Sequence, residues 1–256
     1  MELDVVFVLM AVAAAAGWLD AVVGGGGLLL LPALMVAAPG TPVATLLGTN
    51  KLSSIFGVSS AAVGYARTIK IERRIVVPTA CLALGGSALG AGLAGVLSTE
   101  TLRPIIMTVL LVAMAIVVLR PGLGKLPDPK PLTRGRVIAA CAVAGIAVSF
   151  YDGLVGPGTG VFLILCFTAV TGLDFVRASA SAKVVNVGTN LGALAVFAFN
   201  GQVLWLLGAG LAACSILGAQ IGARTVLRRG TGFVRTILVV VVLALLVKLG
   251  YDQLIS

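Results

Sequence analysis

The chain has 256 residues, of which 59% are hydrophobic and only 11% are charged, and its mean hydropathy is +1.15. Soluble domains carry about 25% charged residues, so this composition excludes an ordinary soluble domain and predicts a membrane protein in contact with the lipid bilayer. The net charge of +9 does not indicate a nucleic-acid partner, because Lys and Arg stand in short clusters between apolar segments, as in cytoplasmic loops.

Ten apolar segments follow one another along the chain, and we expect all of them to be helices. The opening MELDVVFVLM lacks the basic region of a secretory signal, so the first segment is expected to stay in the protein as a membrane helix. In chain order the segments cover residues 4–23, 27–38, 43–64, 75–97, 102–119, 137–155, 159–171, 176–199, 203–223 and 233–250.

Two of these segments, 27–38 and 159–171, are too short to cross a membrane. About twelve residues give roughly 18 Å of helix, against a hydrocarbon core of about 30 Å. Each follows a glycine cluster, GGGG after Asp20 and GPGTG after Asp152. Irregular backbone at membrane depth persists only where protein buries it or where it lines a polar cavity. We therefore predict broken or re-entrant helices around an internal site.

The two halves of the sequence repeat each other at one fixed offset. A shift of 132 residues places Asp20 on Asp152 and Lys51 on Lys183 without a gap, which indicates an internal duplication. The predicted units are a first membrane repeat of residues 1–119, a linker of residues 120–136 and a second membrane repeat of residues 137–256.

Basic residues predict how the halves are oriented. The loop after the third segment holds four of them between residues 67 and 74, whereas the equivalent loop FNGQV holds none. The next loop reverses this, with Arg103 alone in the first half and four arginines between residues 224 and 235 in the second. Because cytoplasmic loops are rich in Lys and Arg, we expect an inverted repeat with the linker in the cytoplasm and both termini outside.

The glycine clusters are candidates for an anion site. In transporters built from inverted repeats, half-helix N-termini direct backbone N–H groups and a positive dipole at an anion near the midplane. The alternative is that these glycines only let helices pack closely. The candidate binding residues at the two breaks are Gly24, Gly25, Gly26, Gly27, Gly156, Gly158, Thr159 and Gly160.

Lys51 and Lys183 stand about eight residues, roughly 12 Å, inside their segments. A lysine at that depth costs about 2.5 kcal/mol or more, so its presence in both halves indicates a shared purpose. Three interpretations stay open, namely anion binding, an ion pair with Asp20 or Asp152, and snorkelling to the interface.

Uncharged polar side chains accompany the lysines. Hydroxyl and amide groups suit oxyanion recognition, although they also join helices in membranes. Asp20 and Asp152 are candidates for coupling to protons or cations, with neutralisation of a lysine and exposure near a membrane surface as the alternatives. The polar candidates for substrate binding are Thr49, Asn50, Ser54, Asn186 and Asn190.

Enzyme functions find no support in the motifs. The chain has no histidine, no phosphate-binding loop and no complete dinucleotide fingerprint after a strand. Its four cysteines lie in apolar segments without metal-ligand spacing. We therefore expect no enzymatic activity, no cofactor and no metal.

Four stretches resemble the sulfite exporter TauE/SafE family, also known as the four-toluene-sulfonate uptake permeases. They are GWLDAVVGGGGLLLLPAL (17–34) and GTPVATLLGTNKLSSIFG (40–57) in the first half, and DGLVGPGTGVFLI (152–164) and ASASAKVVNVGTNLGAL (178–194) in the second. The resemblance covers essentially the whole chain. It departs from the family at Leu28, where the family often has a fifth glycine, and at Pro157 and Thr159.

The resemblance implies movement of small sulfur-containing anions, such as sulfite, sulfonates, sulfoacetate or thiosulfate, across the bacterial cytoplasmic membrane. Our hypothesis is a secondary transporter that works by alternating access. The anion is held at the midplane between the breaks, with Lys51 or Lys183 neutralising it. Coupling to protons through Asp20 or Asp152 and passive export down the membrane potential both stay open. An anion channel and a membrane scaffold that transports nothing are the alternatives.

Overall fold

The computed structural model describes residues 3–98 and 133–255, and every regular element in these ranges is a helix. The predicted segment 102–119 and most of the predicted linker lie outside the described residues. In the first half the helices are α1 (Leu3–Val23), α2 (Gly26–Ala37), α3 (Val43–Ala66) and α4 (Arg73–Val96).

The second half begins with one continuous helical run. It consists of α6 (Arg134–Ala140), the π-helix η1 (Cys141–Val148) and α7 (Ser149–Leu154). Its start at Arg134 places the last three residues of the predicted linker in a helix. The following helices are α8 (Thr159–Thr171), α9 (Phe175–Phe199) and α10 (Trp205–Ile255).

The helix α10 replaces the last two predicted segments. It bends at Gly230, whose backbone is not helical (φ 73°, ψ −165°), so the break falls between residues 223 and 233 as the sequence predicts. A glycine is suited to this position because other residues rarely adopt a positive φ.

Five helical stretches of the described chain are long and apolar enough to cross a membrane. The helix α3 has 24 residues, but the polar side chains around Lys51 lower its hydropathy. An all-helical, polytopic membrane protein is therefore confirmed. The five stretches are Leu3–Val23, Arg73–Val96, Arg134–Leu154, Phe175–Phe199 and Trp205–Val234.

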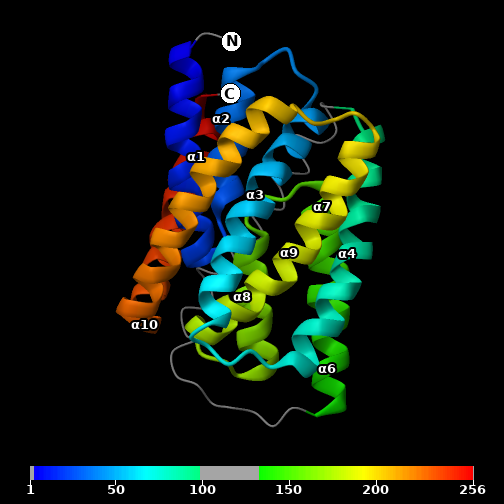
Figure 1. Cartoon of the computed structure of the whole chain (residues 1–256), viewed down its shortest axis with the longest axis vertical. Coiled ribbons are helices and arrows are strands. Elements are labelled where there is room, and N and C mark those ends of the chain that lie inside the picture. Colours follow the sequence, from blue (N-terminus) through cyan, green and yellow to red (C-terminus); the bar gives the residue numbers. More distant parts are fainter. Residues whose placement is uncertain (1–2, 99–132, 256) are drawn as a thin grey trace.

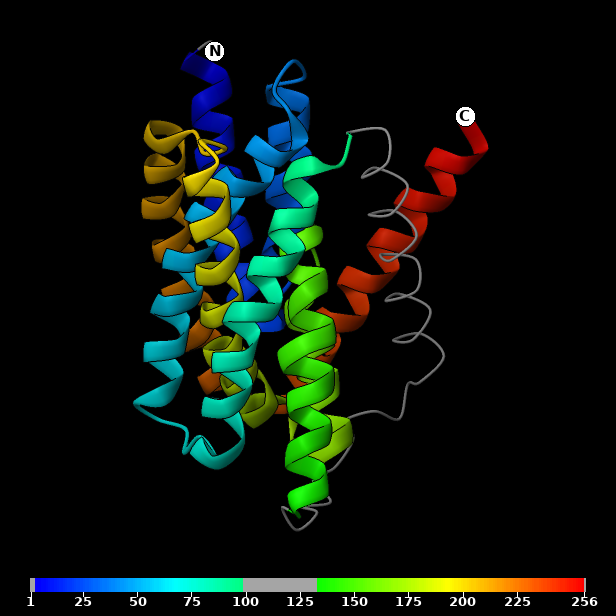
Figure 2. The same cartoon turned by 90° about the vertical axis from the view of Figure 1, so that its right-hand side faces the viewer.

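Two helical hairpins enter the bundle from opposite ends (Figure 1). The helix α1 descends from the end where the chain begins, and α2 turns back toward that end. The run α6 to α7 rises from the other end, and α8 turns back down. Figure 2 shows that α3 and α9 also run in opposite directions, as do α4 and the first part of α10. These directions agree with the inverted repeat, which stays a prediction.

The first helix of each half packs against the fourth helix of the other half. The helix α1 lies along α10, and α7 lies along α4. Glycines make both contacts close, because a Cβ at Gly218 would overlap the backbone of Ala14, and a Cβ at Gly90 would overlap that of Phe150. Small residues allow such backbone approach between membrane helices. The two halves therefore interlock instead of forming separate domains.

The buried apolar side chains form two clusters. One contains Leu9 of α1, Leu34 of α2 and Leu211 of α10. The other contains Ile75 of α4 and Phe167 of α8. The breaks in both hairpins, and the polar middle of α3 and α9, lie between the two clusters. This arrangement places the candidate site at the centre of the bundle.

The connection from α3 to α4, the starts of α6 and α9, and the part of α10 before its bend lie at the end of the bundle opposite the start of α1 (Figure 2). Basic residues occupy all of these places. This is the charge distribution that the positive-inside rule describes. The basic residues at these places are Arg67, Lys70, Arg73, Arg74, Arg134, Arg136, Arg177, Arg224, Arg228 and Arg229.

Candidate functional site

Both hairpins turn at glycines in equivalent positions. Gly24 follows α1 with φ 78°, and Gly156, its counterpart 132 residues later, follows α7 with φ 91°. Left-handed backbone of this kind ends a helix at little cost only when the residue is glycine. The helices therefore break where the sequence predicts, directly after the segments that carry Asp20 and Asp152.

The tips of the two hairpins touch through their backbones. The Gly160 N–H donates a hydrogen bond to the Gly24 carbonyl oxygen at 3.2 Å. A Cβ on either residue would overlap the backbone of the other. The N-terminal ends of the half-helices α2 and α8 thus meet near the centre of the protein, and close packing is one function of these two glycines.

Each buried lysine forms an ion pair with the aspartate of the other half. Lys51 Nζ lies 2.7 Å from Asp152 Oδ2. Lys183 Nζ lies 3.7 Å from Asp20 Oδ1. Only 2% of the Lys51 surface and none of the Lys183 surface is exposed, so neither side chain snorkels to an interface in this conformation. Of the three interpretations of the lysines, the structure shows the ion pair with an aspartate.

A small polar cavity of about 20 Å³ lies between the hairpin tips and the middle of α3 and α9. All of its lining residues belong to the set that the sequence predicted for substrate binding or coupling. They are Asp20, Gly24, Gly27, Asn50, Lys51, Ser54, Asp152, Gly156, Thr159, Gly160, Asn186 and Asn190.

Five predicted binding residues do not line this cavity. Gly25 and Gly158 are the N-caps of α2 and α8, and Gly26 packs against the backbone and side chains of α1. The Thr49 hydroxyl is used elsewhere, because it donates to the Thr45 carbonyl and accepts from the Leu204 N–H. Lys183 is the fifth of these residues, and it reaches the site only through its ion pair with Asp20.

The amides at the cavity differ in how they are held. The Asn186 Oδ1 accepts hydrogen bonds from Thr189 Oγ1 at 2.9 Å and Asn190 Nδ2 at 3.0 Å, which leaves its NH₂ group as the donor it can offer to a ligand. The buried Asn50 Oδ1 has no hydrogen-bond partner among the described residues. Buried polar atoms are usually satisfied, so Asn50 marks a place where a further polar group fits.

Two tyrosines that the sequence interpretation missed hold the breaks in position. Tyr65 O–H donates to the Ala21 carbonyl at 3.0 Å, near the C-terminal end of α1. Tyr151 O–H donates to the Pro157 carbonyl at 2.6 Å, between the glycines of the second break. The last carbonyls of a helix have no partner inside the helix, so such donors stabilise a buried helix end. No motif in the sequence identifies them, because only the fold brings donor and acceptor together.

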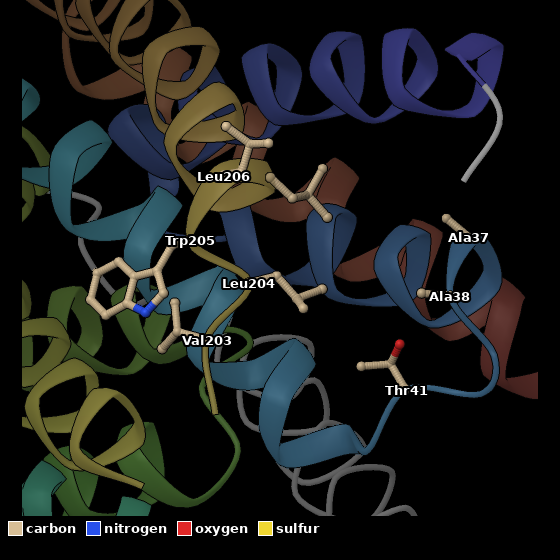
Figure 3. Close-up of a pocket in the computed structure, with 8 residues that line it drawn as sticks. Ala37, Ala38, Thr41, Val203, Leu204, Trp205 and Leu206 are labelled. Carbon is tan, nitrogen blue, oxygen red and sulfur yellow. The ribbon is translucent and has the colours of Figure 1, made fainter. Parts of the chain in front are cut away.

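A wider hollow of about 710 Å³ lies between the end of α2 and the start of α10 (Figure 3). Its lining, which includes Ala37, Val203, Trp205 and Leu206, contains no charged residue. It offers an anion neither a cation nor a cluster of donors, so the small central cavity is the better candidate site. In the described part of the chain, no group of three or more His, Cys, Asp or Glu side chains is placed to hold a metal ion.

The fold and this centre define a polytopic helical membrane protein in which two half-helices meet beside buried ion pairs. The chain belongs to the sulfite exporter TauE/SafE family, whose family model matches residues 9–249. It is therefore a membrane transporter of that type.

Curated relatives agree with this assignment. The "Probable membrane transporter protein ORF9" of Sinorhizobium sp is 35% identical over 95% of this chain and 92% of its own length. The "Probable membrane transporter protein YfcA" of Escherichia coli K12 is 35% identical over 96% of this chain and 90% of its own length. A "Probable membrane transporter protein" of Haemophilus influenzae is 33% identical over 98% and 96%. No solved structure matches the chain significantly.

Proposed function

We propose that the protein is a secondary transporter that moves small sulfur-containing anions of the sulfite, sulfonate, sulfoacetate or thiosulfate type across the bacterial cytoplasmic membrane. The observation that carries this proposal is the central cavity, where an ammonium group, hydroxyls and amides meet the N-terminal ends of two half-helices. The family supports the sulfur chemistry, because it is described as a sulfite exporter family.

The chemistry of the lining suits a small oxyanion. Lys51 supplies a cation, and Ser54 and Asn186 supply uncharged donors, whereas the Thr159 hydroxyl donates to the Gly156 carbonyl at 2.7 Å. The positive ends of the α2 and α8 dipoles add to the attraction for an anion. An anion held there has its oxygens spread over several donors and lies beside the Lys51 ammonium group.

The small volume of the cavity favours alternating access over an open pore. A volume of about 20 Å³ is close to what one water molecule needs, and is too small for a sulfur oxyanion. The hairpin tips must therefore separate before substrate binds. Because the hairpins enter from opposite ends (Figure 1), movement of one opens a path to one side while the other stays closed.

The charges of the site favour coupling to protons. Two lysines and two aspartates give the buried centre a formal charge of zero. An anion that enters adds a negative charge at low dielectric, which is costly unless a proton enters with it. We therefore propose protons as the coupling ion.

Ligand-induced thermal stabilisation of the purified protein tests the proposed function. The panel is sulfite, methanesulfonate, sulfoacetate, thiosulfate, taurine, sulfate and acetate. We expect stabilisation by one class of sulfur anion, its loss in Lys51→Ala that still folds, and its retention in Lys70→Ala, which removes an exposed lysine. No stabilisation by any sulfur anion, together with no uptake or efflux in proteoliposomes, would contradict the proposal. Flux that saturates with substrate separates a transporter from a channel.

We also propose that the basic end of the bundle faces the cytoplasm and that both termini lie outside. A membrane-impermeant maleimide tests this in a variant whose four native cysteines are replaced by alanine. Gly40→Cys, in the loop between α2 and α3, should react in intact spheroplasts, whereas Lys70→Cys should react only after lysis. The opposite pattern would reverse the orientation.

A further inference from the structure

The two buried ion pairs differ in their access to the cavity. Lys51 and Asp152 both line it, and their charged groups are 2.7 Å apart. Of the other pair, Asp20 lines the cavity and Lys183 does not. An anion in the cavity therefore reaches the Lys51 ammonium directly, whereas Lys183 stands behind Asp20.

From this difference, and resting on the proposed function, we infer that Lys51 and Asp152 form an exchangeable pair. The substrate anion replaces the Asp152 carboxylate as the partner of Lys51, and Asp152 takes up the coupled proton. The ion pair between Lys183 and Asp20 remains intact and takes no part in proton uptake.

The proton could go to Asp152 or to Asp20, and the charges that each choice leaves in the site decide between them. With the anion on Lys51 and the proton on Asp152, each lysine keeps one negative partner and the site stays neutral. With the proton on Asp20, Lys183 loses the negative partner that it has in the described part of the chain, and Lys51 faces two anions. Lys183 is fully buried, and its Nζ forms no hydrogen bond with the described residues. An uncompensated buried charge is strongly unfavourable, so the first alternative is preferred.

Few other ionisable side chains lie near Asp152. Lys51 faces it from α3, and Asp20 faces the same cavity from α1. Tyr151, its neighbour, directs its hydroxyl to the Pro157 carbonyl. The residues that α2, α8 and α9 contribute to the cavity lining are glycine, threonine and asparagine, and Ser87 and Ala91 of α4 pack against Gly153. Asp20, Asp152 and Lys51 are thus the ionisable side chains of the cavity lining.

The test is anion affinity as a function of pH, combined with proton uptake in weakly buffered solution. The main probe is methanesulfonate, a monoanion, and the dianions sulfoacetate and thiosulfate are further probes; none of the three changes its charge between pH 6 and 8. We expect the wild type to take up about one proton per methanesulfonate, so that its affinity for this monoanion falls about tenfold per pH unit while Asp152 is ionised in the free protein.

Variants of the two pairs provide matched controls. In Asp152→Asn we expect tighter anion binding that does not depend on pH and releases or takes up no proton, because the unpaired Lys51 now needs the anion. Asp152→Glu should restore proton uptake. The double variant Asp20→Asn/Lys183→Gln removes the other pair without leaving a charge. Its anion affinity is free to change, because Asp20 lines the cavity, but it should keep the pH dependence of that affinity and the uptake of one proton per methanesulfonate.

Three results would overturn the inference. They are proton uptake that persists in Asp152→Asn, proton uptake that disappears in the double variant while the anion still binds, and wild-type binding with no proton at all. The last of these leaves the proposed transport function standing. If no probe binds the wild type, the proposed function itself fails, and the inference fails with it. If Asp152→Asn does not fold without anion, the pH dependence of the wild-type affinity and the proton uptake of the double variant still test the inference.

Discussion

Two ion pairs cross the centre of the molecule, and each joins a lysine of one half to an aspartate of the other. The pairs are related by the 132-residue repeat, yet their lengths are 2.7 and 3.7 Å. The carboxylate of the shorter pair, Asp152, has 3% of its side chain exposed, and that of the longer pair, Asp20, has 11%. One duplicated arrangement thus provides a tight pair and a loose pair, which allows the two to have different functions.

The helices that precede the two aspartates also differ in their geometry. In the second half, a π-helix over Cys141–Val148 precedes Asp152, and the Ser149 hydroxyl donates to the Ala144 carbonyl inside it. The equivalent residues 9–16 of α1 form a regular α-helix. Short π-helical stretches are frequent at functional sites. The second hairpin is therefore the one in which the helix before the aspartate departs from regular geometry.

The largest expected effect comes from breaking the ion pairs one partner at a time. Lys51→Met and Lys183→Met should each lower the free energy of unfolding by roughly 3 kcal/mol or more, because each leaves a carboxylate without its partner. Lys51→Met should cost more, since Asp152 is more enclosed than Asp20. Unfolding by denaturant in detergent measures both values.

A double-mutant cycle on each pair makes this comparison quantitative. We expect a larger coupling energy between Lys51 and Asp152 than between Lys183 and Asp20, because the first pair is 1.0 Å shorter (3.7 minus 2.7 Å). Equal coupling energies would show that the two pairs do not differ energetically, which would contradict the distinction between a tight and a loose pair.

The contact between the hairpin tips gives the next effect. Gly160→Ala places a methyl group against the Gly24 backbone, whereas Gly92→Ala, also in a helix, places it in open space. Overpacking typically costs 1–3 kcal/mol, so Gly160→Ala should lower the midpoint of thermal unfolding and Gly92→Ala should not. Equal stability of the two variants would mean that the tips separate readily.

Much of this arrangement could be predicted from the sequence. Hydropathy gives the segments, and the glycines after Asp20 and Asp152 give the breaks, because those signals are local. Every residue that lines the cavity was among the candidates, since a charged or glycine-rich stretch inside an apolar segment has few structural uses. Their role in substrate binding remains a prediction.

The sequence could not show which candidates face the cavity. Lys51 and Lys183 occupy equivalent positions, and only packing makes the first a lining residue and leaves the second behind Asp20. Thr49 fits an anion site by residue type, but its hydroxyl binds Leu204, which is 155 residues away along the chain. Long-range partners of this kind depend on tertiary structure and leave no local pattern.

A hydroxyl that only one half possesses gives a smaller effect. Tyr65 donates to the Ala21 carbonyl, whereas its counterpart in the second half is Phe197, which has no such donor. Tyr65→Phe leaves that buried carbonyl without the donor, at a cost of about 1–3 kcal/mol. Thermal unfolding should show the loss, and anion binding should weaken little, because Tyr65 does not line the cavity. An unchanged unfolding midpoint would mean that another donor replaces the hydroxyl.

The smallest expected effect concerns the starts of the two central helices. Asp174 caps α9 by accepting a hydrogen bond from the Arg177 N–H at 2.9 Å, whereas Pro42, the equivalent residue, leaves α3 without a side-chain cap. Asp174→Ala should destabilise the protein by about 1 kcal/mol, and Asp174→Asn should be nearly neutral, because asparagine caps equally well. If Asp174→Asn costs as much as Asp174→Ala, the stabilisation comes from the ion pair with Arg177. The exposed surface of Arg177 argues against that outcome, since exposed pairs contribute little.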